Sequence, residues 1–211
     1  MASPGPLLKA ATLALLVGVW GTTWAAIRIS LRGFPPLTAV AVRFAIAGAL
    51  LLLVSRAMGT PLKPIHRADR WLRLLHALCS FCISYGVVFW AEQWVPSGLA
   101  SVLFATFPML VVVLGSFTLP GERMTAPVVA GTVLGFAGIA VIFAEDFELL
   151  GGEQVLRAAV VLLAAPLASA VAVIAVKRWG QGIHKVPFNA SAMVIGAVVM
   201  AAVAAAAASG R

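Results

Sequence analysis

Long uninterrupted apolar stretches recur along this chain of 211 residues, and they restrict its fold more than any other feature. A helix that crosses the hydrocarbon core of a bilayer needs about 20 mostly apolar residues. Backbone in lipid must satisfy its own hydrogen bonds, and stretches of this length favour helices over a closed barrel. We therefore predict an all-α integral membrane protein. Its seven predicted transmembrane helices are Leu8–Ile27, Leu37–Val54, Leu74–Ala91, Ser97–Leu119, Ala126–Ala144, Ala158–Val176 and Phe188–Ala208.

Charged residues are too few to cover a soluble globule of this size. The chain is 62% hydrophobic and 10% charged, whereas soluble domains are about a quarter charged. Most of the surface must therefore face lipid, which makes the bilayer the first expected partner and excludes soluble enzymes. The net charge of +8 does not indicate nucleic acid, because the basic residues are scattered between apolar stretches and form no stripe with interleaved aromatic side chains.

The basic residues instead predict how the chain crosses the membrane, because cytoplasmic loops carry the excess of lysine and arginine. With the amino terminus inside, ten basic residues fall in inner segments and four in outer segments. The inner ones are Lys9, Arg56, Lys63, Arg67, Arg70, Arg73, Arg123, Lys177, Arg178 and Lys185. We therefore expect a multi-pass protein of the inner (plasma) membrane with a cytoplasmic amino terminus and an acidic outer loop over Glu145–Gln154.

Arg43 is a charged residue well inside a predicted span, about 10 Å from its outer end at a rise of 1.5 Å per residue. An arginine at that depth costs roughly 2.5 kcal/mol or more unless it snorkels, pairs or faces a wet cavity. Glu92, at the outer end of the third predicted span, lies at a depth that Arg43 can reach. Two interpretations stay open. Arg43 lines a substrate path, or it is a structural residue that pairs with Glu92 or with backbone carbonyls.

Polar and helix-bending residues mark a candidate substrate pathway. Pro108 lies inside the fourth predicted span, where it removes a helical hydrogen bond and bends the helix, and bent spans often surround a transport site. Thr23 lies in a polar and aromatic cluster of the first span, and Tyr85 is the single tyrosine of the chain. The candidate pathway residues are Thr23, Arg43, Tyr85, Ser101, Thr106 and Pro108.

Three glycines of the fifth predicted span, Gly131, Gly135 and Gly138, follow the spacing that places residues on one helix face. Such a face lets another helix approach closely. We expect these glycines to act in helix packing rather than in binding.

Sequence patterns typical of catalysis are absent. Cys79 and Cys82 have C-x-x-C spacing, but in a membrane helix they merely share a face, and even with His76 they lack a fourth metal ligand. Metalloprotease, serine-hydrolase and P-loop motifs do not occur. We therefore expect no enzyme activity, no cofactor and no bound metal.

Short motifs follow one another in a specific order between Trp20 and Phe143. They are Trp20-Gly21-Thr22-Thr23-Trp24, Arg43-Phe44, Ala47-Gly48, Val95-Pro96-Ser97-Gly98-Leu99-Ala100-Ser101 with Pro108, Gly121-Glu122-Arg123, and the three glycines Gly131, Gly135 and Gly138. With these motifs the chain resembles the EamA family of the drug/metabolite transporter superfamily. We expect structural roles for Trp20, Gly21, Glu92, Gly121, Glu122, Gly131, Gly135 and Gly138, with Glu122 fixing the inner turn between the fourth and fifth spans.

The resemblance implies two five-helix repeats, the second inverted in the membrane. It assigns residues 1–144 to a complete first repeat, residues 145–154 to an outer linker and residues 155–211 to the first two helices of a second repeat. We expect the chain to be truncated or completed by another chain, such as a second copy in a homodimer.

The function that the resemblance implies is secondary transport, by efflux or exchange, of a small organic metabolite or drug-like solute. The alternative is a non-transporting membrane scaffold, or a half-transporter subunit that needs a partner chain.

Overall fold

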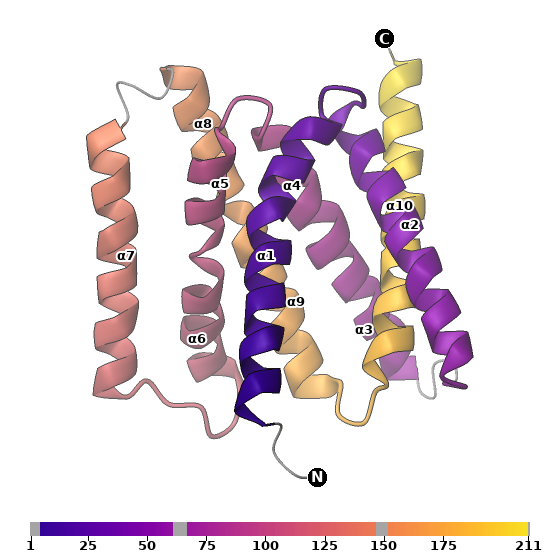
Figure 1. Cartoon of the computed structure of the whole chain (residues 1–211), viewed down its shortest axis with the longest axis horizontal. Helices are drawn as coiled ribbons and strands as arrows, with labels where there is room; N and C mark the ends of the chain where they lie inside the picture. Colours follow the sequence, from indigo (N-terminus) through magenta and orange to yellow (C-terminus); the bar gives the residue numbers. More distant parts are fainter. Residues whose placement is uncertain (1–4, 61–66, 147–151, 211) are drawn as a thin grey trace.

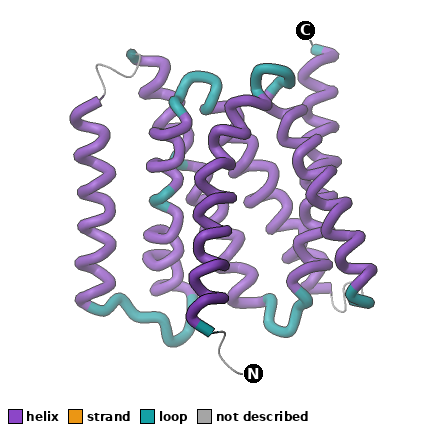
Figure 2. The backbone as a smooth tube through the Cα atoms, in the orientation of Figure 1, coloured by secondary structure: helices purple, strands orange, loops and turns teal. Residues whose placement is uncertain are grey.

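A computed structural model describes residues 5–60, 67–146 and 152–210, except for the side chains of 67, 68, 139, 140 and 142–146. This described part is helical and contains no strand (Figure 2). Half of the predicted outer loop over Glu145–Gln154 lies outside the described residues, as does Lys63. The helices are α1 (Pro6–Ser30), α2 (Pro36–Ala57), α3 (Arg67–His76), η1 (Ala77–Ser84), α4 (Tyr85–Ala91), α5 (Ser97–Phe104), α6 (Phe107–Thr118), α7 (Ala126–Asp146), α8 (Glu153–Leu162), α9 (Ala164–Trp179) and α10 (Lys185–Ser209).

Six segments of the described chain are long and apolar enough to cross a membrane, and they confirm six of the seven predicted spans. They are Pro6–Ser30, Pro36–Ala57, Asp69–Ala91, Ser97–Thr118, Glu153–Trp179 and Lys185–Ser209. At the fifth predicted span the structure gives a shorter apolar segment, Ala126–Gly138, within α7. The third and sixth spans begin five residues earlier than predicted, at Asp69 and Glu153.

Three of these spans are interrupted. The fourth breaks between α5 and α6, directly before Pro108, as predicted. The sixth breaks at Leu163, between α8 and α9, three residues before Pro166. A proline cannot donate a helical hydrogen bond and its ring crowds the preceding turn, so both breaks have the same cause. The third span contains the π-helix η1 in its middle, which the sequence did not predict.

The spans run up and down between two ends of the molecule, with the two termini at opposite ends (Figure 1). We call the end near the amino terminus the N-terminal side and the other the C-terminal side. Helices α2 and α10 pack against each other most extensively, and α9 packs against α6 and η1. Helix α1 contacts α5, whereas α7 lies at the edge of the bundle beyond α6 (Figure 1).

Close packing at glycine lies elsewhere than predicted. A Cβ atom at Gly131 or Gly138 would meet no described atom within 4 Å, and only Gly135 of that face is approached, by Met109 of α6. The Gly135 contact is with the flexible end of the Met109 side chain, whereas two contacts of α10 involve atoms at or near the backbone. A Cβ at Gly48 of α2 would lie 2.9 Å from Val194 of α10, and one at Gly196 of α10 would lie 2.8 Å from Phe81 of η1. Gly131 and Gly138 are therefore exposed, and only Gly135 of the predicted packing face meets a neighbouring helix of the described chain.

Candidate functional site

A cavity of about 460 Å³ lies between α1, η1, α4, α5, α6 and α9. Five of the fourteen residues that line it are aromatic. Trp24 of α1 contacts Phe104 of α5 edge to face, with 5.6 Å between ring centroids, and Phe104 stacks on Phe107 of α6 at 6.0 Å. Trp20 and Tyr85 also line the cavity. The break before Pro108 brings Phe107 and Pro108 to the wall, so the helix interruption shapes the cavity.

Besides Tyr85, four residues with hydroxyl groups interrupt this apolar wall, namely Thr23, Ser80, Ser101 and Ser169. Thr23 donates to the Val19 carbonyl at 2.8 Å, and Ser101 donates to the Gly98 carbonyl at 2.7 Å. Ser169 of α9 donates to the hydroxyl of Ser84 at 2.9 Å. Because a hydroxyl that donates its proton to the protein keeps free lone pairs, these groups offer acceptors to the cavity.

The cavity gathers most of the predicted pathway residues. Thr23, Tyr85, Ser101 and Pro108 line it. Thr106 does not, because its side chain is buried and its hydroxyl donates to the Leu103 carbonyl at 2.7 Å.

Sequence reasoning missed two polar residues of the wall, Ser80 and Ser169. Both are polar residues within otherwise apolar spans, and Ser169 follows the helix-breaking Pro166 by three residues. A search for hydroxyls near helix breaks could have found Ser169.

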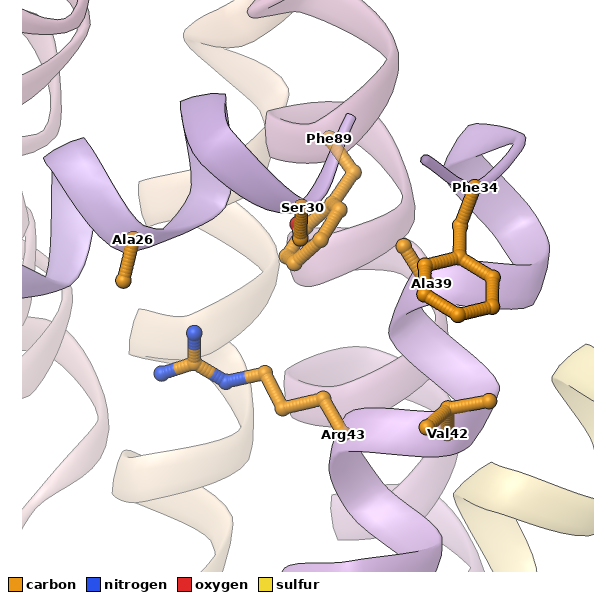
Figure 3. Close-up of a pocket in the computed structure, with 7 residues that line it drawn as sticks. All are labelled: Ala26, Ser30, Phe34, Ala39, Val42, Arg43 and Phe89. Carbon is orange, nitrogen blue, oxygen red and sulfur yellow. The ribbon is translucent and has the colours of Figure 1, made fainter. Parts of the chain in front are cut away.

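Arg43 lines a second, smaller pocket of about 200 Å³ between α1, α2 and Phe89 of α4. Its side chain extends from α2 towards the part of α1 that carries Ala26 (Figure 3). The guanidinium carbon lies 5.3 Å from the centroid of the Tyr85 ring, a distance typical of a cation–π contact. Tyr85 also lines the large cavity, so Arg43 contacts a residue of the cavity wall without lining the cavity itself.

The structure does not bring Arg43 to Glu92, one of its two predicted partners. The Glu92 carboxylate accepts a hydrogen bond from Ser97 at 3.2 Å, and Arg28 of α1 donates to the backbone carbonyls of Glu92 and Val95. Glu92 therefore helps to hold the loop between α4 and α5 against the end of α1. Arg43 instead contacts the ring of Tyr85, and its role as a pathway residue stays a prediction.

We expect the stability effects of Arg43→Met and Glu92→Gln to add in a double-mutant cycle, within about 0.5 kcal/mol, because the two side chains share no contact. Thermal or denaturant unfolding in detergent measures the four proteins of the cycle. A coupling energy well above 1 kcal/mol would contradict this arrangement. Arg43→Lys is the matched control, because it keeps a cation near Tyr85.

Glu92 is fully buried just beyond the end of the third span, and its Oε1 has no hydrogen-bond partner among the described residues. Burial raises the pKa of Glu92 from its ordinary value of 4.5 to about 7, although Ser97 and Arg28 act in the opposite direction. Because the folded protein then holds a proton that the unfolded chain releases above pH 4.5, stability should fall as the pH rises between these values.

The melting temperature should therefore be lower at pH 8 than at pH 5, and most of the change should fall between pH 4.5 and about 7. Glu92→Gln should remove most of this dependence, since glutamine does not titrate. Glu153→Gln is the control, because the Glu153 carboxylate is exposed and pairs with Arg157 at 2.5 Å. An unchanged pH dependence in Glu92→Gln would show that another group causes it.

On the N-terminal side, Glu122 pairs with a residue of another span, which the sequence did not predict. Gly121, with a φ of +85°, makes the turn that the motif requires. The Glu122 carboxylate, however, forms an ion pair with Lys177 at the end of α9, and Arg178 donates to the Thr118 carbonyl at the end of α6. The predicted role of fixing the turn between the fourth and fifth spans is thus extended: Glu122 also joins this turn to the sixth span.

Lys177→Met should destabilise the protein by less than about 1 kcal/mol, because both side chains of the pair are partly exposed, at 53% and 39%. The charge-exchanged double variant Glu122→Lys with Lys177→Glu should recover part of what each single variant loses. Unfolding at low and high salt measures this, and Lys185→Met serves as the control. Equal losses in the single and double variants would exclude the pair.

The sequence of this chain is similar to a protein family and to several known proteins. The sequence profile described as "EamA-like transporter family" matches residues 8–144. The "uncharacterized transporter YvbV" of Bacillus subtilis is 31% identical over 192 residues, which cover 89% of this chain and 60% of that protein. Protein PagO of Salmonella typhimurium is 27% identical, covering 87% of this chain and 59% of that protein. This chain thus spans about three fifths of the length of these relatives.

A solved crystal structure shares the fold. It superposes with a TM-score of 0.66 at 23% sequence identity, and the match covers 88% of this chain and 62% of the other. The "uncharacterized inner membrane transporter YedA" of Escherichia coli is 36% identical over a shorter stretch of 125 residues, 57% of this chain and 39% of that protein.

Proposed function

This chain belongs to the EamA-like transporter family of multi-pass membrane proteins, and we propose that it is a secondary carrier that moves a small organic solute through the cavity lined by Tyr85, Ser101 and Ser169. Members of this family are transporters and not enzymes. The observation that carries the proposal is the cavity itself. Five aromatic side chains line it, and four serine and threonine residues from different spans lie in its wall.

The wall chemistry supports a particular class of solute. A cavity of about 460 Å³ suits a small organic molecule. Aromatic rings favour an aromatic or aliphatic body, and their faces also attract a cationic group. Hydroxyls that already donate to the protein accept from the solute, so the solute should carry at least one N–H or O–H donor.

The proposal includes how the chain lies in the membrane. We assign the N-terminal side to the cytoplasm, because Arg56, Arg123, Lys177 and Arg178 lie on that side (Figure 1). The membrane is then the inner or plasma membrane. We also propose a first repeat over residues 1–144, a linker over 145–154 and an inverted second repeat that begins at residue 155, with the transport step as an exchange of access between the two sides.

Purified protein in proteoliposomes tests the proposal. A radiolabelled panel should contain aromatic and aliphatic solutes in cationic, neutral and anionic forms, with and without hydrogen-bond donors. We expect counterflow of at least one small solute with an apolar body and a donor group, above the rate in protein-free vesicles. Protein that is folded and correctly inserted, yet moves no member of the panel, would contradict the proposal.

A second candidate is a subunit that transports only together with a partner chain. Its support is the exposure of α1, whose apolar window is only 6% buried, with Trp20 71% exposed. Such a face would be covered by further helices of a partner or a second copy. Cross-linking in native membranes, followed by transport assays of the isolated complex and of the single chain, separates the two candidates.

A further inference from the structure

A chain of hydrogen bonds connects the cavity wall to the N-terminal side of the bundle. It centres on His76, the last residue of α3, where the π-helix η1 begins. The hydroxyl of Ser80, which lines the cavity, lies 3.3 Å from Nδ1 of His76. Nε2 of the same ring lies 3.2 Å from Oδ1 of Asn189 on α10. One turn before His76, Arg73 donates to Ser191 of α10 at 3.0 Å.

The partners of the His76 ring determine which nitrogen carries the proton when the ring is neutral. Nδ2 of Asn189 donates to the Lys185 carbonyl at 2.9 Å, which turns Oδ1 of the amide towards His76. An amide oxygen only accepts, so Nε2 must be the protonated nitrogen. Nδ1 then has a lone pair and accepts the Ser80 hydroxyl proton. In this state the Ser80 oxygen offers only lone pairs to the cavity.

Protonation of the ring reverses the Ser80 hydrogen bond. A proton from cavity water forms an N–H bond at Nδ1, and this N–H can only donate, so the Ser80 oxygen becomes its acceptor. The Ser80 hydroxyl proton must then turn towards the cavity. In the neutral state the Ser80 oxygen accepts a hydrogen bond from a solute donor. In the protonated state the Ser80 O–H faces that donor, and the two repel each other.

We propose that His76 is a proton-binding site coupled to the solute cavity through Ser80, so that the proton and a donor-bearing solute weaken each other's binding. Such mutual weakening must be equal in both directions by linkage. It is what an exchanger needs, because the cavity then releases solute when it takes up a proton and releases the proton when it takes up solute. The transport consequence of this inference rests on the proposed function, whereas the proton site at His76 does not depend on it.

Aromatic side chains surround the His76 ring. The ring lies against Phe81 and Phe188, with centroids 5.1 and 5.4 Å away, and aromatic rings accept either a neutral or a cationic neighbour. The titratable and charged groups on the elements packed around it are Asp69, Arg70 and Arg73 of α3, Cys79 and Cys82 of η1, Tyr85 of α4, Lys177 and Arg178 of α9, and Lys185 of α10. Histidine is the one side chain among these types whose ordinary titration falls near neutral pH.

Nitrogen-15 NMR of histidine-labelled protein in nanodiscs tests the proton site without any solute. His76→Gln assigns the His76 signals among those of the three histidines. At high pH we expect the Nε2–H tautomer, and on acidification a proton should bind at Nδ1. Ser80→Ala should shift the Nδ1 signal of the neutral ring, whereas the neighbouring control Cys79→Ala should not. An Nδ1–H tautomer, or a ring insensitive to Ser80→Ala, would overturn the assignment.

Transport of a solute found with the panel tests the coupling. In the wild type, an imposed pH gradient should accelerate net solute flux. His76→Gln should keep solute counterflow, which needs no net proton movement, and lose the acceleration. A wild-type solute flux that does not change with the pH gradient would overturn the coupling. An acceleration of flux by the gradient that persists in His76→Gln would do the same. Absence of all transport, with an intact NMR titration, would instead count against the proposed function.

Discussion

Replacing Gly196 by leucine is expected to destabilise the protein by about 3 kcal/mol or more, because the new side chain has no space. Gly196 is buried on the face of α10 that meets η1. A Cβ alone would lie 2.8 Å from Cβ of Phe81, and the next nearest atoms are Cγ of Phe81 and the Ala77 carbonyl oxygen. The first of these atoms is close to the backbone and the last belongs to it, so the contact is relieved only if the helices separate.

Gly131→Leu is the matched control, because it makes the same change in an apolar helix where a Cβ would meet no described atom within 4 Å. It should change the free energy of unfolding by less than about 1 kcal/mol, apart from the gain in helix propensity. Unfolding in detergent compares the two variants. Similar losses in both would mean that α10 does not approach η1 as closely as described.

Hydropathy was sufficient to locate the spans, because a bilayer requires about 20 apolar residues whatever the packing. The position of Pro108 was sufficient to predict a bend in the fourth span, since the loss of a helical donor is a local effect, and the structure has a break there. The breaks at Leu163 and in η1 were missed. Pro166 lies inside the predicted span Ala158–Val176, but no break was predicted from it. A π-helix has no reliable local signal in the sequence.

Side-chain partners were harder to predict than spans, because they depend on how helices rotate against one another. Thr23, Tyr85 and Ser101 could be proposed from their polarity at mid-depth, and they line one cavity. The partner of Arg43 could not be predicted in this way. Its depth in the membrane allowed a contact with Glu92, whereas the rotation of the helices places Tyr85 beside it. The glycines of α7 could be placed on one face from their spacing. The spacing does not determine whether another helix packs on that face, and none approaches Gly131 or Gly138 in the described chain.

The central claim is that the aromatic cavity is the path of the solute, and two adjacent residues of α1 allow a direct test. Thr22 and Thr23 are both threonines whose hydroxyls donate to backbone carbonyls one turn earlier. Thr23 lines the cavity, whereas Thr22 is exposed on the surface of α1 and does not line it. A tryptophan at Thr23 would fill part of the cavity, and one at Thr22 would project away from it.

Solute counterflow in proteoliposomes should therefore fall at least about tenfold in Thr23→Trp, which corresponds to a loss of about 1.4 kcal/mol or more in binding. Thr22→Trp should transport at nearly the wild-type rate, and both variants should unfold at similar temperatures. Transport that survives in Thr23→Trp, or that is lost equally in Thr22→Trp, would contradict the assignment of this cavity as the transport path.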